Sequence, residues 1–166
     1  MARIVQKFGG TSLANIEKIR DAARHVLQAV KGGNEVAVVV SAMSGTTNQL
    51  VSWTEQMGEF GDSSEYDVVV SAGEQVTVGL MAMAIQRLGI QARSWLGWQL
   101  PIRTDTLHAK AHIESIDTVA ISKDLSDGVV AVVPGFQGVN LSNRITTLGR
   151  GGSDYTAAIL GRALGA

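Results

Sequence analysis

Two stretches of this sequence, EVAVVVSAM at residues 35–43 and VVAVVPGF at residues 129–136, are nearly unbroken runs of apolar residues rich in β-branched side chains. A strand with solvent on one face alternates apolar and polar residues, whereas a strand covered on both faces does not. Both stretches are therefore predicted to be strands buried on two sides. Such strands occur mainly in parallel sheets that carry helices on each face.

The segments around these two strands alternate between strand patterns and helix patterns. RIVQKF at residues 3–8 and QARSWLGW at residues 91–98 are typical of strands. Apolar residues at helical spacing predict helices over residues 13–33, 47–60, about 73–88, 117–128 and 153–166. Residues 68–70 could also form a strand, and the polar residues 61–66 are expected to form a surface loop. The alternation predicts an α/β fold: a three-layer α/β/α sandwich with a mostly parallel sheet.

Composition narrows the class of protein. The chain has 166 residues, 45% of them apolar, which is enough for one domain with a substantial core. The 14 basic and 15 acidic residues give a formal charge of −1, so binding to nucleic acid or to an anionic membrane is not expected. There is no cysteine, and the N-terminus does not resemble a signal peptide. We therefore predict a cytoplasmic protein whose partners are small molecules or other protein surfaces.

The chain ends at Ala166, directly after a predicted helix that no strand follows. In a parallel sheet a crossover helix normally leads to the next strand. The sequence is therefore expected to be a domain truncated on its C-terminal side.

Two similar motifs stand where a helix is about to begin. The first glycine turn, KFGGTS at residues 7–12, and the second glycine turn, LGRGGSD at residues 148–154, each combine a basic residue, a glycine pair and a hydroxyl. A helix that follows such a turn presents unpaired backbone N–H groups and the positive end of its dipole, which together favour anions. Neither turn has the pattern of a P-loop or of a dinucleotide-binding motif. An ordinary turn is the alternative for either motif taken alone.

The basic residues of the two turns are Lys7 and Arg150. An ammonium can neutralise a phosphate, and a guanidinium can bind a carboxylate or phosphate through two parallel hydrogen bonds. The remaining candidate residues of the turns are Gly9, Gly10, Gly151, Gly152, Ser153 and Asp154.

Other candidates lie in loops that follow the predicted strands or precede helices. Ser41 and Thr47, in SAMSGTTNQL, could hydrogen-bond a polar ligand or simply cap a helix. Glu74, in the apolar segment SAGEQ, requires a cation nearby, either a protein side chain or the amino group of a substrate. Phe136, in VVPGFQG, could line a pocket or belong to the core. His108 and His112 have no acidic partner at metal-ligand spacing, so no metal site is predicted.

Five motifs in this order and spacing resemble the aspartate kinases of the amino-acid kinase superfamily. They are KFGGTS, VVVSAMSGTTNQL, SAGEQ, VVPGFQG and TTLGRGGSDYTAAILG, and the match runs through essentially the whole chain. The resemblance implies that the chain is the N-terminal, amino-acid-binding part (residues 1–166) of a catalytic domain. It also implies that the segment for the nucleotide base and the regulatory domains are missing, and that an isolated chain could be inactive.

The activity that the resemblance implies is transfer of the γ-phosphoryl group of ATP, with Mg²⁺, to the side-chain carboxylate of L-aspartate, the first step of lysine, threonine and methionine synthesis. Lys7 would neutralise the transferring phosphoryl group, with Asp154 orienting it, and Gly9 and Gly10 would cradle the phosphates. Ser41 would lie near the phosphates and the substrate.

The resemblance also assigns a substrate site. Thr47 and Glu74 would bind aspartate, Glu74 through the amino group, and Phe136 would line the pocket. Arg150 would bind a substrate carboxylate, and Ser153 with Asp154 would complete the site, together with the backbone of Gly151 and Gly152.

Two other functions stay open. The chain could be a non-catalytic module that binds an amino acid or assembles with a longer subunit, or a kinase of the acetylglutamate or glutamate type. A binding module would not need both Lys7 and Asp154, so their presence favours an enzyme. We also expect a homo-oligomer or association with a longer subunit.

Overall fold

The central sheet is parallel, as predicted. In the computed structural model, which describes residues 2–58 and 63–166, four strands pair in the order β1-β2-β6-β3, all parallel. Their bounds are Arg3–Phe8 (β1), Glu35–Val40 (β2), Val130–Pro134 (β6) and Ala92–Ser94 (β3). The two strands with the most continuous apolar runs, β2 and β6, lie at the centre, where Val38 is in register with Val132.

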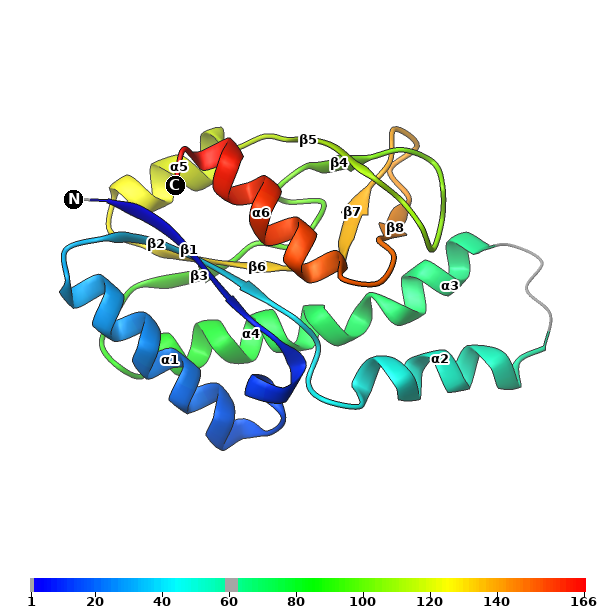
Figure 1. Cartoon of the computed structure of the whole chain (residues 1–166), viewed down its shortest axis with the longest axis horizontal. Helices are drawn as coiled ribbons and strands as arrows, with labels where there is room; N and C mark the ends of the chain where they lie inside the picture. Colours follow the sequence, from blue (N-terminus) through cyan, green and yellow to red (C-terminus); the bar gives the residue numbers. More distant parts are fainter. Residues whose placement is uncertain (1, 59–62) are drawn as a thin grey trace.

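Helices cover both faces of this sheet (Figure 1). The helices α1 (Ile16–Lys31) and α4 (Ala72–Gln86) lie on one face, and α5 (Val119–Ser126) and α6 (Gly152–Leu164) lie on the other. Side chains of β2 divide between the two layers with a period of two. Val36, Val38 and Val40 pack with α1 and α4, while Ala37 and Val39 pack with α5 and α6. The three-layer prediction is thus confirmed.

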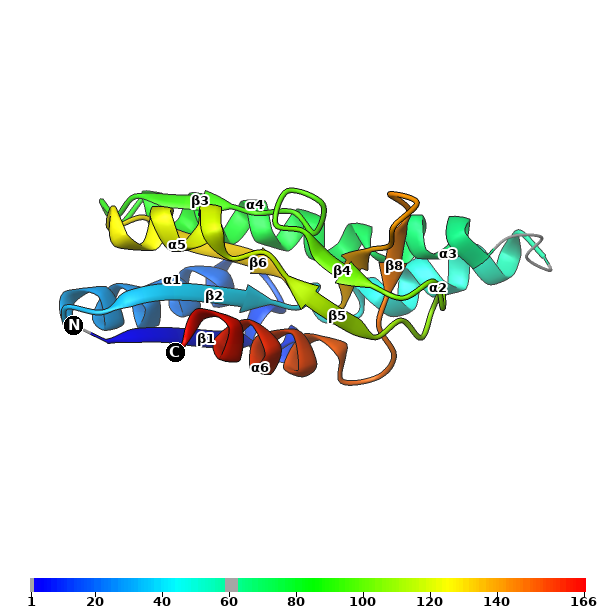
Figure 2. The same ribbon diagram turned by 90° about the horizontal axis from the view of Figure 1, so that it is seen from above.

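A second, smaller sheet stands beside the first (Figures 1 and 2) and was not predicted. Its strands pair in the order β5-β4-β7-β8, with β4 and β7 parallel and the outer pairs antiparallel. Its strands are β4 (Ile102–Thr104), β5 (Ile113–Ile116), β7 (Gln137–Val139) and β8 (Ile145–Thr147). Strands this short carry too few residues to show a periodic pattern.

Two local expectations are corrected. The strand expected over residues 91–98 is shorter, because β3 pairs with β6 only over Ala92–Ser94 and the chain then turns. The surface loop expected over residues 61–66 is wrong for residues 63–66, because α3 spans Ser63–Val70, whereas residues 61 and 62 lie outside the described residues. The alternative of a strand over residues 68–70 is wrong for the same reason. Tertiary contacts bury Ser64 and Asp67, so polar composition alone misled the prediction.

The other helices agree with the sequence. The helix α1 begins after Asn15, whose Oδ1 accepts a hydrogen bond from the Lys18 amide at 2.9 Å. The helix α2 spans Thr46–Gln56, so the predicted helix over residues 47–60 is observed up to that point and its last two residues fall outside the described part. A short 3-10 helix, η1 (Gly10–Leu13), precedes α1.

The helical run Ser63–Gln86, formed by α3 and α4, is long and apolar enough to cross a bilayer by length and composition alone. Half of its most apolar window is buried inside the protein, and core helices of soluble proteins pass the same test. The α4 part of the run packs in the core through Val78, Met81, Ala82 and Ile85.

We predict that Leu160→Ala lowers the free energy of unfolding by about 2–5 kcal/mol, because Leu160 of α6 is fully buried against the sheet. Leu141→Ala is the matched control: this leucine is 83% exposed, so a change within about 0.5 kcal/mol is expected. Urea unfolding of both variants tests this. Equal losses would mean that α6 does not pack on the sheet in solution.

Candidate active site

The parallel direction of the sheet brings the candidate loops together. Parallel strands end at a common edge, which is where open α/β sheets bind ligands. Hydrogen bonds continue this alignment beyond the strands: the Ser41 amide donates to Phe8 O at 3.1 Å, and the Gly135 amide donates to Val40 O at 2.9 Å. The loops after β1, β2 and β6 therefore lie side by side.

A cavity of about 760 Å³ opens at this edge. It is lined by most of the residues singled out from the sequence, namely Lys7, Gly10, Ser41, Thr47, Glu74, Phe136, Arg150, Gly151, Gly152, Ser153 and Asp154. Gly9 is not among the described residues that line the cavity, and a Cβ on it would lie 3.3 Å from Lys7 Nζ. The structure thus collects the predicted residues in one place, while their individual roles stay predictions.

The two glycine turns meet at the cavity. Lys7, near the end of β1, and Asp154, in the first turn of α6, form an ion pair of 2.8 Å between Nζ and Oδ1. The Asp154 side chain is 74% exposed and that of Lys7 is 28% exposed. Such an exposed pair adds little to stability. The pair instead fixes a position, because the Asp154 carboxylate holds the Lys7 ammonium beside the N-terminus of α6.

Glycine is required in these turns for close packing. A Cβ on Gly10 would lie 3.1 Å from Ala42 O, and a Cβ on Gly152 would lie 2.9 Å from Leu148 Cβ. Gly151 has a φ of 75°, in the left-handed region that favours glycine. The backbone can therefore approach the cavity only because side chains are missing there.

Glu74 is the most unusual residue of the cavity. Its side chain is 3% exposed, and Oε1 accepts a hydrogen bond from the Ala42 amide at 3.0 Å. Oε2 is buried without a hydrogen-bond partner among residues 2–58 and 63–166. Burial raises the pKa of Glu74 to about 7, and the Ala42 N–H offsets part of this effect. A cationic group of a ligand would satisfy the unpaired oxygen and favour the ionised form.

Phe136 reaches the cavity through a backbone conformation that is rare for a bulky residue. Its φ is 69°. Two hydrogen bonds hold it: its amide donates to Thr156 Oγ1 at 3.2 Å, and its carbonyl accepts from the Leu148 amide at 2.8 Å. Ser153 packs against the same loop, because a Cβ on Gly135 would lie 2.6 Å from Ser153 Oγ. The loop after β6 and the start of α6 are therefore built as one unit.

Part of the cavity wall was missed by sequence reasoning. Tyr66 of α3, Ala109 of the loop before β5 and Thr147 at the end of β8 line the cavity. They come from α3 and the second sheet, whose strands are too short to predict, and nothing in their local sequence signals a site. Further lining residues that were not singled out are Asn48, Val51 and Leu148.

His108 and His112 each contact a carboxylate. His108 Nδ1 lies 2.6 Å from Asp67 Oδ2, and His112 Nδ1 lies 2.8 Å from Asp105 Oδ2. The first carboxylate comes from α3, 41 residues earlier, so local spacing did not indicate it. Within residues 2–58 and 63–166, no three His, Cys, Asp or Glu side chains form a group that could hold a metal ion.

Comparison with known proteins identifies the family. The amino acid kinase family profile matches residues 2–166, and the chain belongs to this family. It is similar to the aspartokinase of Rickettsia felis, 51% identical over 167 residues, and to that of Geobacillus stearothermophilus, 48% identical over 164 residues. These alignments cover 99% of this chain but 42% and 40% of the relatives. The chain thus spans about two fifths of the length of these relatives.

Solved structures of aspartate kinases have the same fold as this chain. A crystal structure of aspartate kinase from Synechocystis matches with a TM-score of 0.82 at 39% identity, covering 98% of this chain and 26% of that one. E. coli aspartokinase III in complex with aspartate and ADP matches with a TM-score of 0.81 at 26% identity, covering 100% of this chain and 47% of that one. The fold predicted from the sequence is that of these kinases.

The raised pKa of Glu74 predicts how stability depends on pH. Between its ordinary value of 4.5 and about 7, the folded chain holds this proton more tightly than the unfolded chain, so stability falls as pH rises. The loss amounts to at most about 3 kcal/mol. Glu74→Gln keeps the acceptor for Ala42 and removes the ionisation, so its advantage over the unsubstituted chain should grow from pH 5 to pH 8.

Urea unfolding at several pH values measures this difference. Glu114→Gln is the control, because this carboxylate is exposed on β5. Parallel pH profiles for Glu74→Gln and the unsubstituted chain would contradict the assignment.

Proposed function

We propose that this chain is the amino-acid-binding and phosphate-binding part of an aspartate kinase, which transfers the γ-phosphoryl group of ATP to the side-chain carboxylate of L-aspartate. The observation that carries the proposal is the 2.8 Å pair of Lys7 and Asp154 in a cavity that is also lined by Glu74, one carboxylate oxygen of which has no hydrogen-bond partner among the described residues. The similar proteins named aspartokinase support it, as does the E. coli relative solved with aspartate and ADP.

The charges of the site suit this reaction. A bond forms between a carboxylate oxygen of aspartate and the γ-phosphorus, and the bond from that phosphorus to the oxygen of ADP breaks. A carboxylate is already a nucleophile at neutral pH, so no strong general base is needed. The difficulty is repulsion between two anions, and the charge that spreads over the phosphoryl oxygens.

Lys7 and the first glycine turn would reduce the repulsion between the two anions and stabilise the charge on the phosphoryl oxygens. The Lys7 ammonium would lie against the transferring group, held there by Asp154. The backbone at Gly9 and Gly10 would cradle the phosphates at the start of η1, with Ser41 beside them. Mg²⁺ bound to the nucleotide phosphates would supply further neutralising charge.

The opposite part of the cavity would bind aspartate. Glu74 Oε2 is a buried acceptor without a partner among the described residues, which matches the α-ammonium group. Arg150 would bind a carboxylate through its guanidinium, with Thr47 and Ser153 as hydrogen-bonding groups and Phe136 as the wall. An N-acetylated amino acid has no ammonium to pair with Glu74, so this residue favours aspartate over acetylglutamate.

The rest of the proposal concerns the whole protein. The adenine and ribose would be bound by residues beyond this segment, as would any regulatory amino acid. We expect a cytoplasmic enzyme that forms a homo-oligomer or associates with a longer subunit.

We predict that this chain binds L-aspartate and that succinate, which lacks the amino group, binds at least about tenfold more weakly. Binding favours ionised Glu74, whose pKa is about 7 in the free chain, so affinity should rise about tenfold from pH 6 to pH 8. Isothermal titration calorimetry at the two pH values tests both points. Equal affinity for the two ligands would remove Glu74 from ammonium recognition.

We predict that Lys7→Met lowers the turnover of the whole enzyme by about 10²-fold or more, because one charge-stabilising donor is lost. Trapping the acyl phosphate product with hydroxylamine measures the rate. Lys31→Met, at the exposed end of α1, is the control and should leave turnover unchanged. Near-normal turnover of the Lys7 variant would exclude this lysine from the mechanism.

A further inference from the structure

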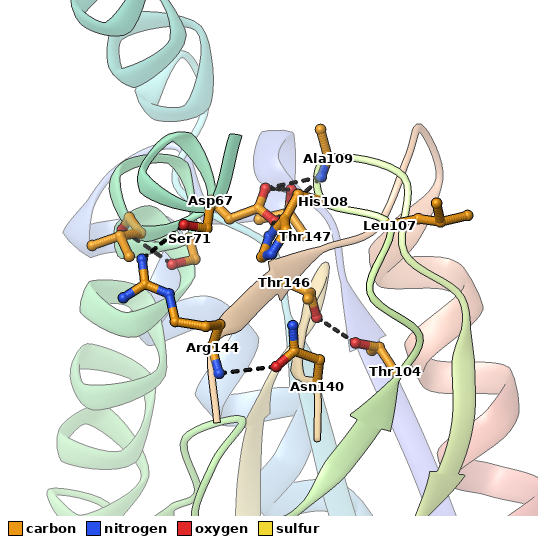
Figure 3. Close-up of polar contacts among 12 residues, drawn as sticks. Asp67, Ser71, Thr104, Leu107, His108, Ala109, Asn140, Arg144, Thr146 and Thr147 are labelled. Atoms are coloured by element: carbon orange, nitrogen blue, oxygen red, sulfur yellow. Dashed lines mark hydrogen bonds and ion pairs between the residues drawn. The ribbon is translucent and has the colours of Figure 1, made fainter. Parts of the chain in front are cut away.

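Asp67 of α3 is a fully buried carboxylate to which the proposed function assigns no role. Burying a carboxylate costs free energy unless several donors compensate it. Here the donors come from two segments far away in the sequence, and Figure 3 shows the Asp67 side chain directed at both. Asp67 therefore connects α3 with segments that are far from it in the sequence.

Four contacts make this connection. His108 Nδ1 lies 2.6 Å from Oδ2, and the Ala109 amide donates to Oδ1 at 3.1 Å and to Oδ2 at 3.2 Å. The Thr147 hydroxyl donates to Oδ1 in a short hydrogen bond. Asp67 thus joins α3 to the loop that contains residues 108 and 109 and to the end of β8.

Each of the three joined segments supplies a residue to the cavity wall. Tyr66 precedes Asp67, and Ala109 and Thr147 contact it; all three neighbours line the cavity. Ala109 has a φ of 62°, an unfavourable conformation for alanine, which the hydrogen bonds to Asp67 hold in place. Thr147 stands directly before the second glycine turn, with Arg150 three residues further on.

Other contacts already dock α3 on the second sheet. Arg144, in the turn between β7 and β8, donates to Ser64 Oγ at 2.9 Å and pairs with Glu65. If the Asp67 contacts were lost, Arg144 would still hold α3 on the second sheet. Ala109 and Thr147 in the cavity wall would lose their hydrogen bonds to Asp67. Stability alone does not call for a carboxylate at this position, because well-packed apolar residues often replace buried charges without loss.

We propose that Asp67 is a positioning residue for the amino acid side of the cavity: it sets Ala109 and Thr147, and through Thr147 the backbone of the second glycine turn. This inference rests on the proposed function, in which that turn binds the carboxylate of aspartate. Asp67 acts on the ligand through these neighbours.

The test compares Asp67→Asn with Thr104→Val in the chain described here. An amide has a single acceptor oxygen, so Asp67→Asn cannot accept all the hydrogen bonds of the carboxylate. Thr104→Val removes the buried Thr104–Thr146 hydroxyl contact of 2.6 Å in the same sheet (Figure 3), and among the described residues that line the cavity neither threonine appears. This second variant controls for a general loss of stability, which urea unfolding measures for both.

Two readouts decide the proposal. Calorimetry should show that Asp67→Asn weakens L-aspartate binding about tenfold or more, the equivalent of one charge-assisted hydrogen bond, while Thr104→Val stays within about twofold. Amide NMR spectra without ligand should show displaced resonances of Gly149, Arg150, Gly151 and Gly152 in Asp67→Asn and unchanged ones in Thr104→Val.

The results that would overturn the role of Asp67 differ from those that would overturn the proposed function. If both variants weaken aspartate binding in proportion to their loss of stability, or if the resonances of residues 149–152 stay in place in Asp67→Asn, Asp67 is a structural residue and the proposal is overturned. If the unsubstituted chain does not bind aspartate, the proposed function fails instead, and the NMR comparison alone decides whether Asp67 positions the turn.

Discussion

Parallel pairing of β1, β2 and β6 is the constraint on which the rest of the structure depends. Because the three strands run in one direction, the loops that follow them end at one edge of the sheet, and residues from distant parts of the sequence meet there. Central strands covered on both faces must be apolar throughout, so the core itself offers few polar groups. The candidate site residues therefore lie at the ends of these strands, in the loops that follow them, and in the first turns of helices such as α4 and α6.

The cavity at this edge is lined by charged side chains in two different environments, one partly exposed and one buried. On one side the Lys7 ammonium is partly exposed and held by Asp154, which suits an anion that enters and leaves. On the other side Glu74 is buried, with its pKa raised by burial and one oxygen without a partner among the described residues. A ligand that carries both a negative group and an ammonium fits such a division, and an amino acid is the simplest ligand of this kind. In the proposed reaction, Lys7 would assist transfer of a phosphoryl group between two anions, and Glu74 would select the acceptor.

The second sheet supplies the wall that completes the cavity. Its strands are short, and much of its attachment to α3 depends on side chains: Asp67 with Thr147 and the loop at Ala109, and Arg144 with Glu65. Such polar contacts are directional, so they fix the position of this wall relative to α3. This is a physical reason for a buried carboxylate in α3, where Ser64 and Val70 are the other buried residues.

The sequence by itself determined the parallel sheet, its covering helices and the residues of the two glycine turns, because long apolar runs and glycine pairs before helices are local signals. It also indicated Glu74 as a carboxylate in need of a cation, because its neighbours in the chain are apolar. The family resemblance implied that Asp154 orients Lys7, and the structure brings the two side chains to 2.8 Å. Only the tertiary structure decided that α3 is a helix and that Asp67 reaches His108, Ala109 and Thr147. The contacts of Asp67 join residues 41 to 80 positions apart, and their free energy arises only when the fold has brought the partners together, so no local pattern records them.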